Sequence, residues 1–360
     1  MERKEYGSEF TETEQQKEVN FLYKTENVIE FLLGRTALEA IIQDAIAEHK
    51  IKKVLLPSYC CHTMIAPFLK HDFEVFFYDV FFSEEAGVLY DIDYSENFDL
   101  ILIMQYFGFQ VPGFEDMICR LKEEKKVVIE DATHSIHQNI PYCFLSDYVF
   151  VSYRKWMATP GGAVVIKRNG KLNQVGMIQN SLTGKKYVEL RKEAVRKKIC
   201  YLYEKDDTDK SYLQIFNEAE EMIETEYVGL AIDEDSRRRI CYTDYNKLSN
   251  RRRENAGYLL ERLREIRGME LPHKFLREGD VPLFVPVFLQ NKMRDQLRKY
   301  LIKNAIYLPI HWPLSSLHHI SVRAENIFKR ELSLICDQRY NVEDMEVIAS
   351  KIEEWMNKNV

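Results

Sequence analysis

The chain has 360 residues, 46% of them hydrophobic and 30% charged, and its formal net charge is −7. This length suits one large α/β domain with a smaller partner, and the negative charge argues against a nucleic-acid-binding surface. No run of about 18 apolar residues occurs, so we expect no transmembrane helix and no membrane partner. The first residues lack the apolar segment of a secretory signal. We therefore expect a cytoplasmic protein with seven reduced cysteines and no metal site.

Strands and helices alternate through the first half of the chain. Beyond Gly34, apolar residues recur at helical spacing from Thr36 to Ile46. The later elements expected in this half are strands at 53–57, 74–80, 99–105, 126–131, 148–152 and 162–166 and helices at 62–70 and 114–124. The alternation predicts a largely parallel sheet with helices on both faces, in which ligands bind beyond the carboxyl ends of the strands.

The second half has a different pattern. It begins with long, charged helices at 190–203, 211–226 and 246–267 and ends with strands at 281–288 and 306–308 and helices at 292–304 and 342–355. We therefore expect an α/β fold with four parts, which are an N-terminal arm and helix at 1–33, a large domain at 34–185, a helical connector at 186–250 and a small C-terminal α/β domain at 251–360.

Asp131 directly follows an apolar strand, in the segment Glu130-Asp-Ala-Thr-His134. A carboxylate at that place costs desolvation free energy unless a cation meets it. A protonated pyridine nitrogen would meet it, and the paired charge would make the ring a stronger electron sink. Aspartate is also a favoured helix N-cap, and the residues alone leave both interpretations open.

Lys155 follows another strand, in the segment Ser152-Tyr-Arg-Lys155. A lysine at an apolar site has a lowered pKa and can form a Schiff base, and the serine could donate to a phosphate. The alternative is an exposed loop lysine. The pair Gly161-Gly162 then permits a tight turn before the next strand.

The segment Gly34-Arg35-Thr36 opens a helix. Free backbone N–H groups and the positive end of the helix dipole suit a phosphate, although a plain helix start is the alternative. Neither G-x-G-x-x-G nor G-x-x-x-x-G-K-[ST] occurs, so dinucleotide and P-loop sites lack support. Each of these signals is weak alone, and their order along the chain is more informative.

In this order the motifs resemble the DegT/DnrJ/StrS family of PLP-dependent aminotransferases, which have the aspartate-aminotransferase-like fold (fold type I). The matching segments are Gly34-Arg-Thr-Ala-Leu, Val54-Leu-Leu-Pro-Ser-Tyr, Tyr106-Phe-Gly108, Ile129-Glu-Asp-Ala-Thr-His134, Ser152-Tyr-Arg-Lys-Trp, Arg252-Arg-Glu-Asn-Ala256, His311-Trp-Pro-Leu and Asp337-Gln-Arg-Tyr340. The Glu-Asp-Ala-x-His and Ser…Lys…Gly-Gly pieces are the most specific.

The resemblance implies pyridoxal 5'-phosphate as the cofactor and a homodimer in which the subunits complete each other's sites. It implies the following contacts: Lys155 as the Schiff-base lysine, Asp131 on the pyridine nitrogen, His134 near the phenolic oxygen, Ser152 with the backbone of Gly34, Arg35 and Thr36 on the phosphate, and Tyr59 on the segment that stacks on the ring.

The chain departs from the family at several of these places. Only Tyr153 and Arg154 lie between the serine and the lysine, where about four residues are usual in the family, and the usual Gly-Glu-Gly-Gly is reduced to Pro160-Gly161-Gly162. Cys61 occupies the common stacking position, so Tyr59, Cys61 and His62 all remain candidates for stacking. The Gly-Tyr-Asn-x-Arg-Met motif, which reaches the neighbouring subunit, is absent. The chain therefore resembles a divergent branch.

The function that this resemblance implies is an aminotransferase for a small, sugar-type keto acceptor with an amino-acid donor. The same lysine and aspartate would serve a PLP-dependent lyase, dehydratase or decarboxylase, and a non-catalytic PLP-binding regulator is a third possibility. An anionic substrate needs local positive charge, for which Arg154 and Arg339 are the candidates. For each arginine the alternative is a structural ion pair.

Overall fold

The computed structural model describes residues 4–12, 15–17, 28–84, 87–136, 145–173, 181–204, 209–290 and 292–360. The chain forms two compact units: unit 1 comprises Met1–Lys50 and Tyr148–Asp244, and unit 2 comprises Ile51–Asp147 and Tyr245–Val360. This grouping differs from the four consecutive parts expected, because the strand at Ala163–Lys167 pairs with the strand at Val28–Phe31, which precedes residue 34.

Unit 1 contains three antiparallel strands in the order β2-β9-β8. Their bounds are Val28–Phe31 for β2, Ala163–Lys167 for β9 and Tyr148–Ser152 for β8, and a short strand β1 spans Tyr6–Gly7. Helix α1 (Gly34–Glu48) packs against β8 and β9. The buried Asp44 fixes this packing, since it accepts from the Tyr148 hydroxyl at 2.7 Å and lies 2.8 Å from Lys167 Nζ.

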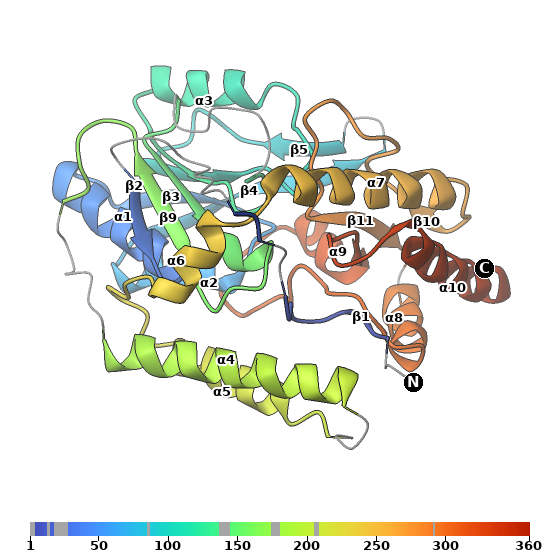
Figure 1. Ribbon diagram of the computed structural model, residues 1–360. Coiled ribbons are helices and arrows are strands. Elements are labelled where there is room, and N and C mark those ends of the chain that lie inside the picture. The colour runs from blue at the N-terminus through green and yellow to red at the C-terminus, as the bar shows by residue number, and fades with distance from the viewer. Residues whose placement is uncertain are drawn as a thin grey trace. The chain divides into compact units, whose positions relative to one another are not determined.

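The helices α4 (Leu182–Tyr203) and α5 (Tyr212–Met222) of unit 1 lie side by side, as Figure 1 shows. Helix α4 begins earlier than the sequence pattern predicts, because Ser181 caps it by accepting from the Gly184 N–H at 2.9 Å. A further helix, α6 (Glu234–Cys241), was not expected, and it is capped by Asp233.

Unit 2 contains a sheet with the strand order β7-β6-β3-β4-β5. Strands β7, β6, β3 and β4 are parallel, as expected, and β5 is antiparallel to β4. The bounds are Lys53–Pro57 for β3, Glu74–Ser83 for β4, Gly87–Asp91 for β5, Leu100–Met104 for β6 and Val127–Asp131 for β7, with α2 at His62–Lys70 and α3 at Phe114–Glu123. All residues of β6 and β7 are buried.

A second sheet of unit 2 has three antiparallel strands in the order β10-β11-β13. The bounds are Met269–Glu270 for β10, Phe284–Leu289 for β11 and Glu331–Ile335 for β13, with a short β12 at Ile306–Tyr307 and helices α7 at Tyr245–Leu263, α8 at Met293–Lys303, α9 at Val322–Arg330 and α10 at Val342–Asn359. The sequence pattern did not predict α9 and β13. Among the described residues, no helix is long and apolar enough to cross a membrane.

The loop after β6 is tied to the segment that leads into β11. Gly108 has φ +82°, and a Cβ there would lie 2.0 Å from the Val281 carbonyl oxygen. The Val281 N–H donates to the Gly108 carbonyl at 3.0 Å, and the Leu283 N–H donates to the Phe107 carbonyl at 2.8 Å. Only glycine permits this approach, which fixes Phe107 within unit 2.

Candidate cofactor site

The amino end of α1 in unit 1 has the properties of a phosphate cradle. Its N-cap residue, Leu33, provides no side-chain hydrogen bond to the first-turn N–H groups. A Cβ on Gly34 would lie 3.2 Å from the Ser152 Cβ, so the missing side chain brings the backbone of α1 close to this buried serine. Backbone amides at a helix start and a serine hydroxyl are the donors that bind phosphate.

The side chains of Arg35 and Thr36 are used elsewhere in unit 1. The Thr36 hydroxyl donates to the Tyr227 carbonyl at 2.6 Å. The Arg35 guanidinium donates to the Glu224 carboxylate at 3.0 Å and to the Ile223 carbonyl at 3.1 Å. Their side chains therefore hold α1 to the segment after α5, and the binding of a phosphate by their backbone N–H groups stays a prediction.

Lys155 ends a short 3-10 helix, Tyr153–Lys155, that follows β8. The glycine pair after it is sterically required, because a Cβ on Gly161 would lie 2.6 Å from the Leu32 carbonyl oxygen. The Gly162 N–H donates to the same carbonyl at 2.6 Å, and the Tyr153 N–H donates to the Gly162 carbonyl at 3.0 Å. The glycine pair thus fixes both ends of the lysine loop against β2 and β9.

Lys155 is exposed within unit 1 and lies among charges, not at the apolar site that the sequence suggested. Its charge contributes to lowering the pKa of Glu9 and of Glu220. For Glu9, burial opposes ionisation, but Arg191, Arg154 and Lys155 outweigh it and lower the pKa to about 2. The Arg191 guanidinium is 2.8 Å from the Glu9 carboxylate.

Arg154 is held by its neighbours in unit 1. Its guanidinium forms an ion pair with Glu220 and donates to the Tyr187 hydroxyl at 2.8 Å. In unit 2, Arg339 donates twice to the buried Asp337, with both distances 2.8 Å. Both arginines therefore form ion pairs, the alternative that the sequence left open, and their contact with substrate stays a prediction.

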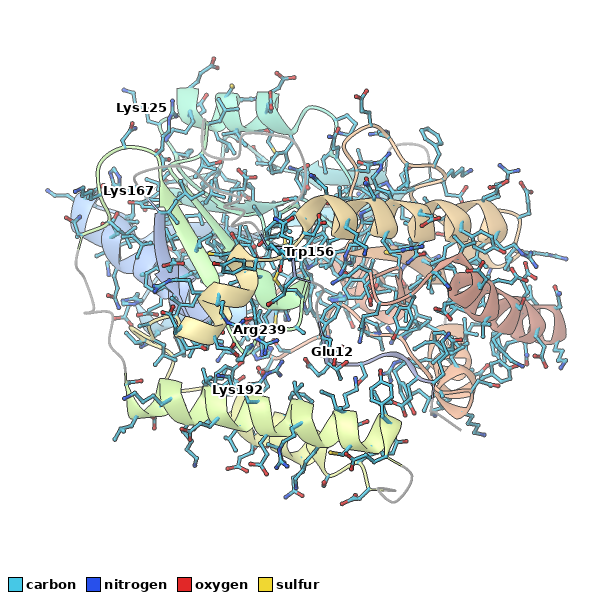
Figure 2. All side chains as sticks on the ribbon, in the orientation of Figure 1. Glu12, Lys125, Trp156, Lys167, Lys192 and Arg239 are labelled. Carbon is cyan, nitrogen blue, oxygen red and sulfur yellow. The ribbon has the colours of Figure 1, made fainter. Side chains whose placement is uncertain are left out.

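A cavity of about 500 Å³ lies in unit 1 next to the lysine loop. Its walls are the N-terminal arm at 9–12, the loop at 157–160, which begins two residues after Lys155, one face of α4, and Arg239 of α6. Figure 2 labels Glu12 of the arm, Lys192 of α4 and Arg239 of α6, which line the cavity. The cationic side chains in the lining are Arg191, Lys192, Arg196 and Arg239.

In unit 2, Asp131 ends the buried strand β7 and is itself 6% exposed. Its carboxylate accepts from the Thr133 N–H at 2.8 Å, and residues 133–136 form a turn. The neighbouring Glu130 is also buried, and burial raises its pKa to about 8 despite a hydrogen bond from the Ser146 hydroxyl. The turn, not a helix, follows Asp131, so the described residues show no helix for it to cap.

The ring of His134 is fixed on several sides within unit 2. The Phe107 N–H donates to its Nδ1 at 3.2 Å, so Nε2 carries the proton of the neutral ring. The ring stacks on Trp312, with centroids 5.7 Å apart and an interplanar angle of 24°. His134 is 4% exposed, and its tautomer is set by the loop that Gly108 positions.

Tyr59 has no exposed surface and lies in an aromatic cluster of unit 2. It stacks on Tyr106 at 5.7 Å and contacts Trp312 at 5.2 Å. Cys61 is less buried, and hydrogen bonds from His62 and Thr63 overcome burial to lower the pKa of its thiol. The residue that stacks on the cofactor ring therefore stays a prediction, with Tyr59, Cys61 and His62 as candidates.

His311, which the sequence offered only within a matching segment, lies near His134 in unit 2 and contacts two residues that the sequence did not single out, Ser333 and Glu331. The His311 ring is 5.8 Å from the His134 ring, and His311 hydrogen-bonds to Ser333 and Glu331. A signal existed in the sequence, since Glu331 and Ser333 are polar residues two apart in an otherwise apolar strand and so share one face.

Comparison with known proteins gives one consistent result at the level of structure. No protein-family model matches the chain, and no curated protein is similar to it in sequence. Solved structures do match. PseC from Helicobacter pylori, an aminotransferase involved in pseudoaminic acid biosynthesis, is 12% identical, with a TM-score of 0.65 over 94% of this chain and 88% of that one.

Two other solved structures match the chain to a similar extent. A DegT DnrJ EryC1 StrS aminotransferase from Brucella abortus is 14% identical, with a TM-score of 0.61 over 92% of this chain and 86% of that chain. A putative sugar aminotransferase from Streptococcus pneumoniae, Spr1654 in its PLP form, is 12% identical, with a TM-score of 0.60 over 93% and 88%. The chain therefore has the fold of these aminotransferases, which confirms the α/β, fold type I prediction.

The residues described above suit the chemical groups of PLP. Unit 1 provides an amine on Lys155, a serine hydroxyl and first-turn amides for a phosphate, and a glycine position that a side chain would fill. Unit 2 provides a buried carboxylate for a ring nitrogen and a neutral histidine with a defined tautomer. Taken separately, unit 1 offers groups that suit the aldehyde and the phosphate of the cofactor, and unit 2 offers groups that suit its pyridine nitrogen and phenolic oxygen.

Proposed function

We propose that this protein is a PLP-dependent aminotransferase that acts on a small, sugar-type keto acceptor with an amino-acid donor. The observation that carries the proposal is the α1 start of unit 1, where Gly34 brings backbone amides against Ser152 in the same unit as Lys155. The aminotransferase fold supports it.

Each residue has a separate task in this proposal. Lys155 Nζ would hold the cofactor and would move the proton at the substrate carbon. Ser152 and the backbone of Gly34, Arg35 and Thr36 bind the phosphate. Asp131 keeps the ring nitrogen protonated, and His134 donates from Nε2. The bound cofactor supplies an electron sink for the bond that is broken.

The cavity of unit 1 supports a small polar acceptor rather than a polymer. Its volume of about 500 Å³ matches a small molecule, and Met157–Pro160 in its wall begin two residues after Lys155. The lining carries four cationic side chains and three carboxyl side chains, those of Glu9, Glu12 and Glu204, and this small excess of positive charge favours an acceptor with a negative group. Arg154 and Arg339 remain the two substrate-contact candidates from the sequence, and their ion pairs would have to open for direct contact.

The same proposal includes a homodimer and a cytoplasmic location. The dimer rests on the resemblance, since subunits of this fold class usually complete each other's cofactor sites. The location stays an expectation from the sequence. Sedimentation at micromolar concentration tests the dimer, because a fully active monomer would contradict it.

The test of the proposal is borohydride reduction of the purified protein with PLP. We expect a yellow protein and, after reduction and digestion, one labelled peptide that contains Lys155. Lys167 is the matched control in the same unit, since its ammonium is buried against Asp44 at 2.8 Å (labelled in Figure 2). A label on Lys167 or Lys171, with none on Lys155, would contradict the assignment.

A screen of amino donors then separates the reactions. An aminotransferase loses its yellow absorbance when an amino donor is added and recovers it when a keto acceptor follows. A lyase, dehydratase or decarboxylase consumes the amino acid without this two-step change. A protein that binds PLP on Lys155 but turns over no amino compound would be the regulator.

A further inference from the structure

A hydrogen-bonded chain of three side chains connects a buried carboxyl group to the ring of His311 in unit 2. The Ser333 hydroxyl donates to Glu331 Oε1, and the His311 backbone N–H donates to Glu331 Oε2 at 2.8 Å. The His311 Nδ1 lies 2.8 Å from the Ser333 hydroxyl oxygen. Glu331 and Ser333 lie on one face of β13 and neither has exposed surface.

The groups around Glu331 place the pKa of its carboxyl group close to neutral pH. Burial raises its pKa to about 8, against the hydrogen bonds from Ser333 and the His311 N–H and the charge of Arg294. Arg294 of α8 donates to the Glu331 carbonyl at 3.1 Å and is itself paired with Asp295. Tyr59 faces the same carboxyl, and its phenol is kept neutral by burial and by Glu331.

The protonation state of Glu331 decides which way the hydrogens point along the chain. Oε2 always accepts from the His311 N–H, so a proton on the carboxyl must sit on Oε1. Protonated Glu331 then donates to Ser333, whose hydroxyl donates to Nδ1 and leaves the ring proton on Nε2. Ionised Glu331 accepts from Ser333, whose oxygen then accepts from Nδ1–H, so the ring proton is on Nδ1.

The ring of His311 belongs to the same aromatic group as His134. It meets His134 at 5.8 Å, Phe107 at 5.7 Å and Trp312 at 5.5 Å, in each case edge to face. His134 is the residue that the proposed function places beside the phenolic oxygen of the cofactor. His311 is half-buried. Its second ring nitrogen, Nε2, can donate or accept a hydrogen bond in the same region of unit 2.

We propose that Glu331 and Ser333 form a proton relay that sets the ring tautomer of His311 and so decides whether its Nε2 donates or accepts a hydrogen bond beside His134. Glu331 and Ser333 are positioning residues, because they act through His311. As the pH rises, one proton moves from Glu331 Oε1 to Ser333 and one from Ser333 to His311 Nδ1, while His311 releases its Nε2 proton to solvent. Glu331 thus loses one proton, and Ser333 and the His311 ring each keep the number they had. The role of His311 toward substrate rests on the proposed function, whereas the relay itself does not.

The test is the tautomer of His311, measured by two-bond proton–nitrogen NMR correlation on the full chain labelled with ¹⁵N-histidine. His311→Asn identifies the signals of this ring. Over the range in which the ring is neutral, we expect Nε2–H at low pH and Nδ1–H above the pKa of Glu331, about 8. The measurement needs no cofactor, so its outcome is independent of whether the protein is an aminotransferase.

Two variants make the test specific. In Glu331→Gln the amide oxygen accepts from the His311 N–H and the amide N–H₂ donates to Ser333, which locks the ring as Nε2–H at every pH. Ser333→Ala breaks the relay, so the tautomer no longer changes with Glu331. Ser333→Thr keeps a hydroxyl and should restore the change. A wild-type tautomer that is constant across pH, or that changes equally in Glu331→Gln, would overturn the proposal.

His318 provides a matched internal control in the same unit. It also contacts a serine, at 2.8 Å between Nδ1 and the Ser315 hydroxyl, but the Ser315 N–H donates to Nδ1 and Nε2 lies 3.0 Å from the Cys60 carbonyl oxygen. Backbone groups therefore fix it as Nε2–H. Its signals should stay constant in all variants, and this constancy also reports that each variant is folded.

If the protein is active as proposed, the pH profile of kcat/KM should also depend on the relay. We expect a limb near the pKa of Glu331 that is present in wild type and in Ser333→Thr and absent in Glu331→Gln. A limb that persists in Glu331→Gln, with the tautomer locked, would show that His311 does not contact the substrate. A failed relay and a failed function are thus distinguished by the NMR and kinetic results.

Discussion

The two units hold their candidate residues in opposite environments. In unit 1, Lys155 is exposed and surrounded by ion pairs, with Arg154, Arg191, Glu9 and Glu220 near it. In unit 2, by contrast, the candidates are buried among aromatic rings and hydrogen bonds. Unit 2 also contains two buried carboxyl groups, those of Glu130 and Glu331, whose pKa values are raised to about 8 by burial.

This contrast shows what each unit can contribute. Unit 1 provides charge and backbone amides, which bind anions strongly but whose attraction is screened by water. Unit 2 provides buried hydrogen-bond donors and acceptors in fixed positions. In such surroundings a single neighbouring group can decide which atom carries a proton. We therefore expect changes in unit 2 to alter proton transfer and changes in unit 1 to alter binding, and the following predictions test this division.

The largest effect should come from Asp131→Asn. Asparagine keeps an oxygen that can accept from the Thr133 N–H, which Asp131 holds at 2.8 Å, so the substitution removes mainly the charge. We expect the rate of transamination to fall by more than about 100-fold, comparable to the loss of one preorganised stabilising group at a reacting centre. Steady-state rates and PLP titration measure this.

Asp131→Ala is the control for the structural role of the same side chain. It removes the Thr133 contact as well as the charge, and it should be the less stable variant in urea. Near-normal rates in Asp131→Asn would contradict the cofactor role. Equal losses of stability in both variants would mean that the carboxylate serves the turn alone.

A smaller effect is expected at the phosphate cradle of unit 1. In Gly34→Ala the new Cβ would lie 3.2 Å from the Ser152 Cβ, so it crowds the place where amides and hydroxyl would meet a phosphate. We expect PLP affinity to fall about 10-fold, or about 1.4 kcal/mol, with the rate at saturating cofactor little changed. PLP titration by absorbance measures the affinity.

Gly257→Ala is the matched control, because it lies inside helix α7 and its new Cβ would meet only Leu276 Cδ1, at 3.7 Å. Alanine is preferred to glycine in a helix by roughly 0.8–1 kcal/mol. This variant should therefore gain stability and bind PLP as wild type does. Equal PLP affinity in both variants would argue against the cradle.

The smallest effect should come from Glu9→Gln in the ion-pair cluster of unit 1. The folded pKa of Glu9 is lowered from 4.5 to about 2, so its ionised form stabilises the fold above pH 4.5, and this contribution is lost as the pH falls toward 2. Its side chain is 43% exposed, so we expect less than about 1 kcal/mol at pH 7.

Urea unfolding at pH 7 and pH 3 measures this difference. The advantage of wild type over Glu9→Gln should be present at pH 7 and smaller at pH 3. Glu12→Gln, at an exposed residue of the same arm, is the control and should leave stability unchanged at both values. A difference that grows at pH 3 would contradict the sign of the effect.

The sequence predicted the elements of the sheets well where the pattern was unambiguous. The apolar runs at 53–57 and 148–152 became β3 and β8 with the same bounds, because a strand that is buried on both faces has no polar residue to interrupt it. The pattern failed for α9 and β13, where Glu331 and Ser333 break the apolar run of β13 and hide a fully buried strand.

The sequence by itself determined the residue types of the site and their order: a glycine at a helix start, a strand ending in Asp131, and Ser152 and Lys155 before a glycine pair. It could do so because strand ends and glycine turns are local features. Only the tertiary structure decided what surrounds these residues. Glu9 and Glu220 reach the neighbourhood of Lys155, and Glu331 reaches His311, from distant parts of the sequence. Charge and proton position depend on such distant neighbours, because electrostatic interactions follow distance in space rather than separation along the chain.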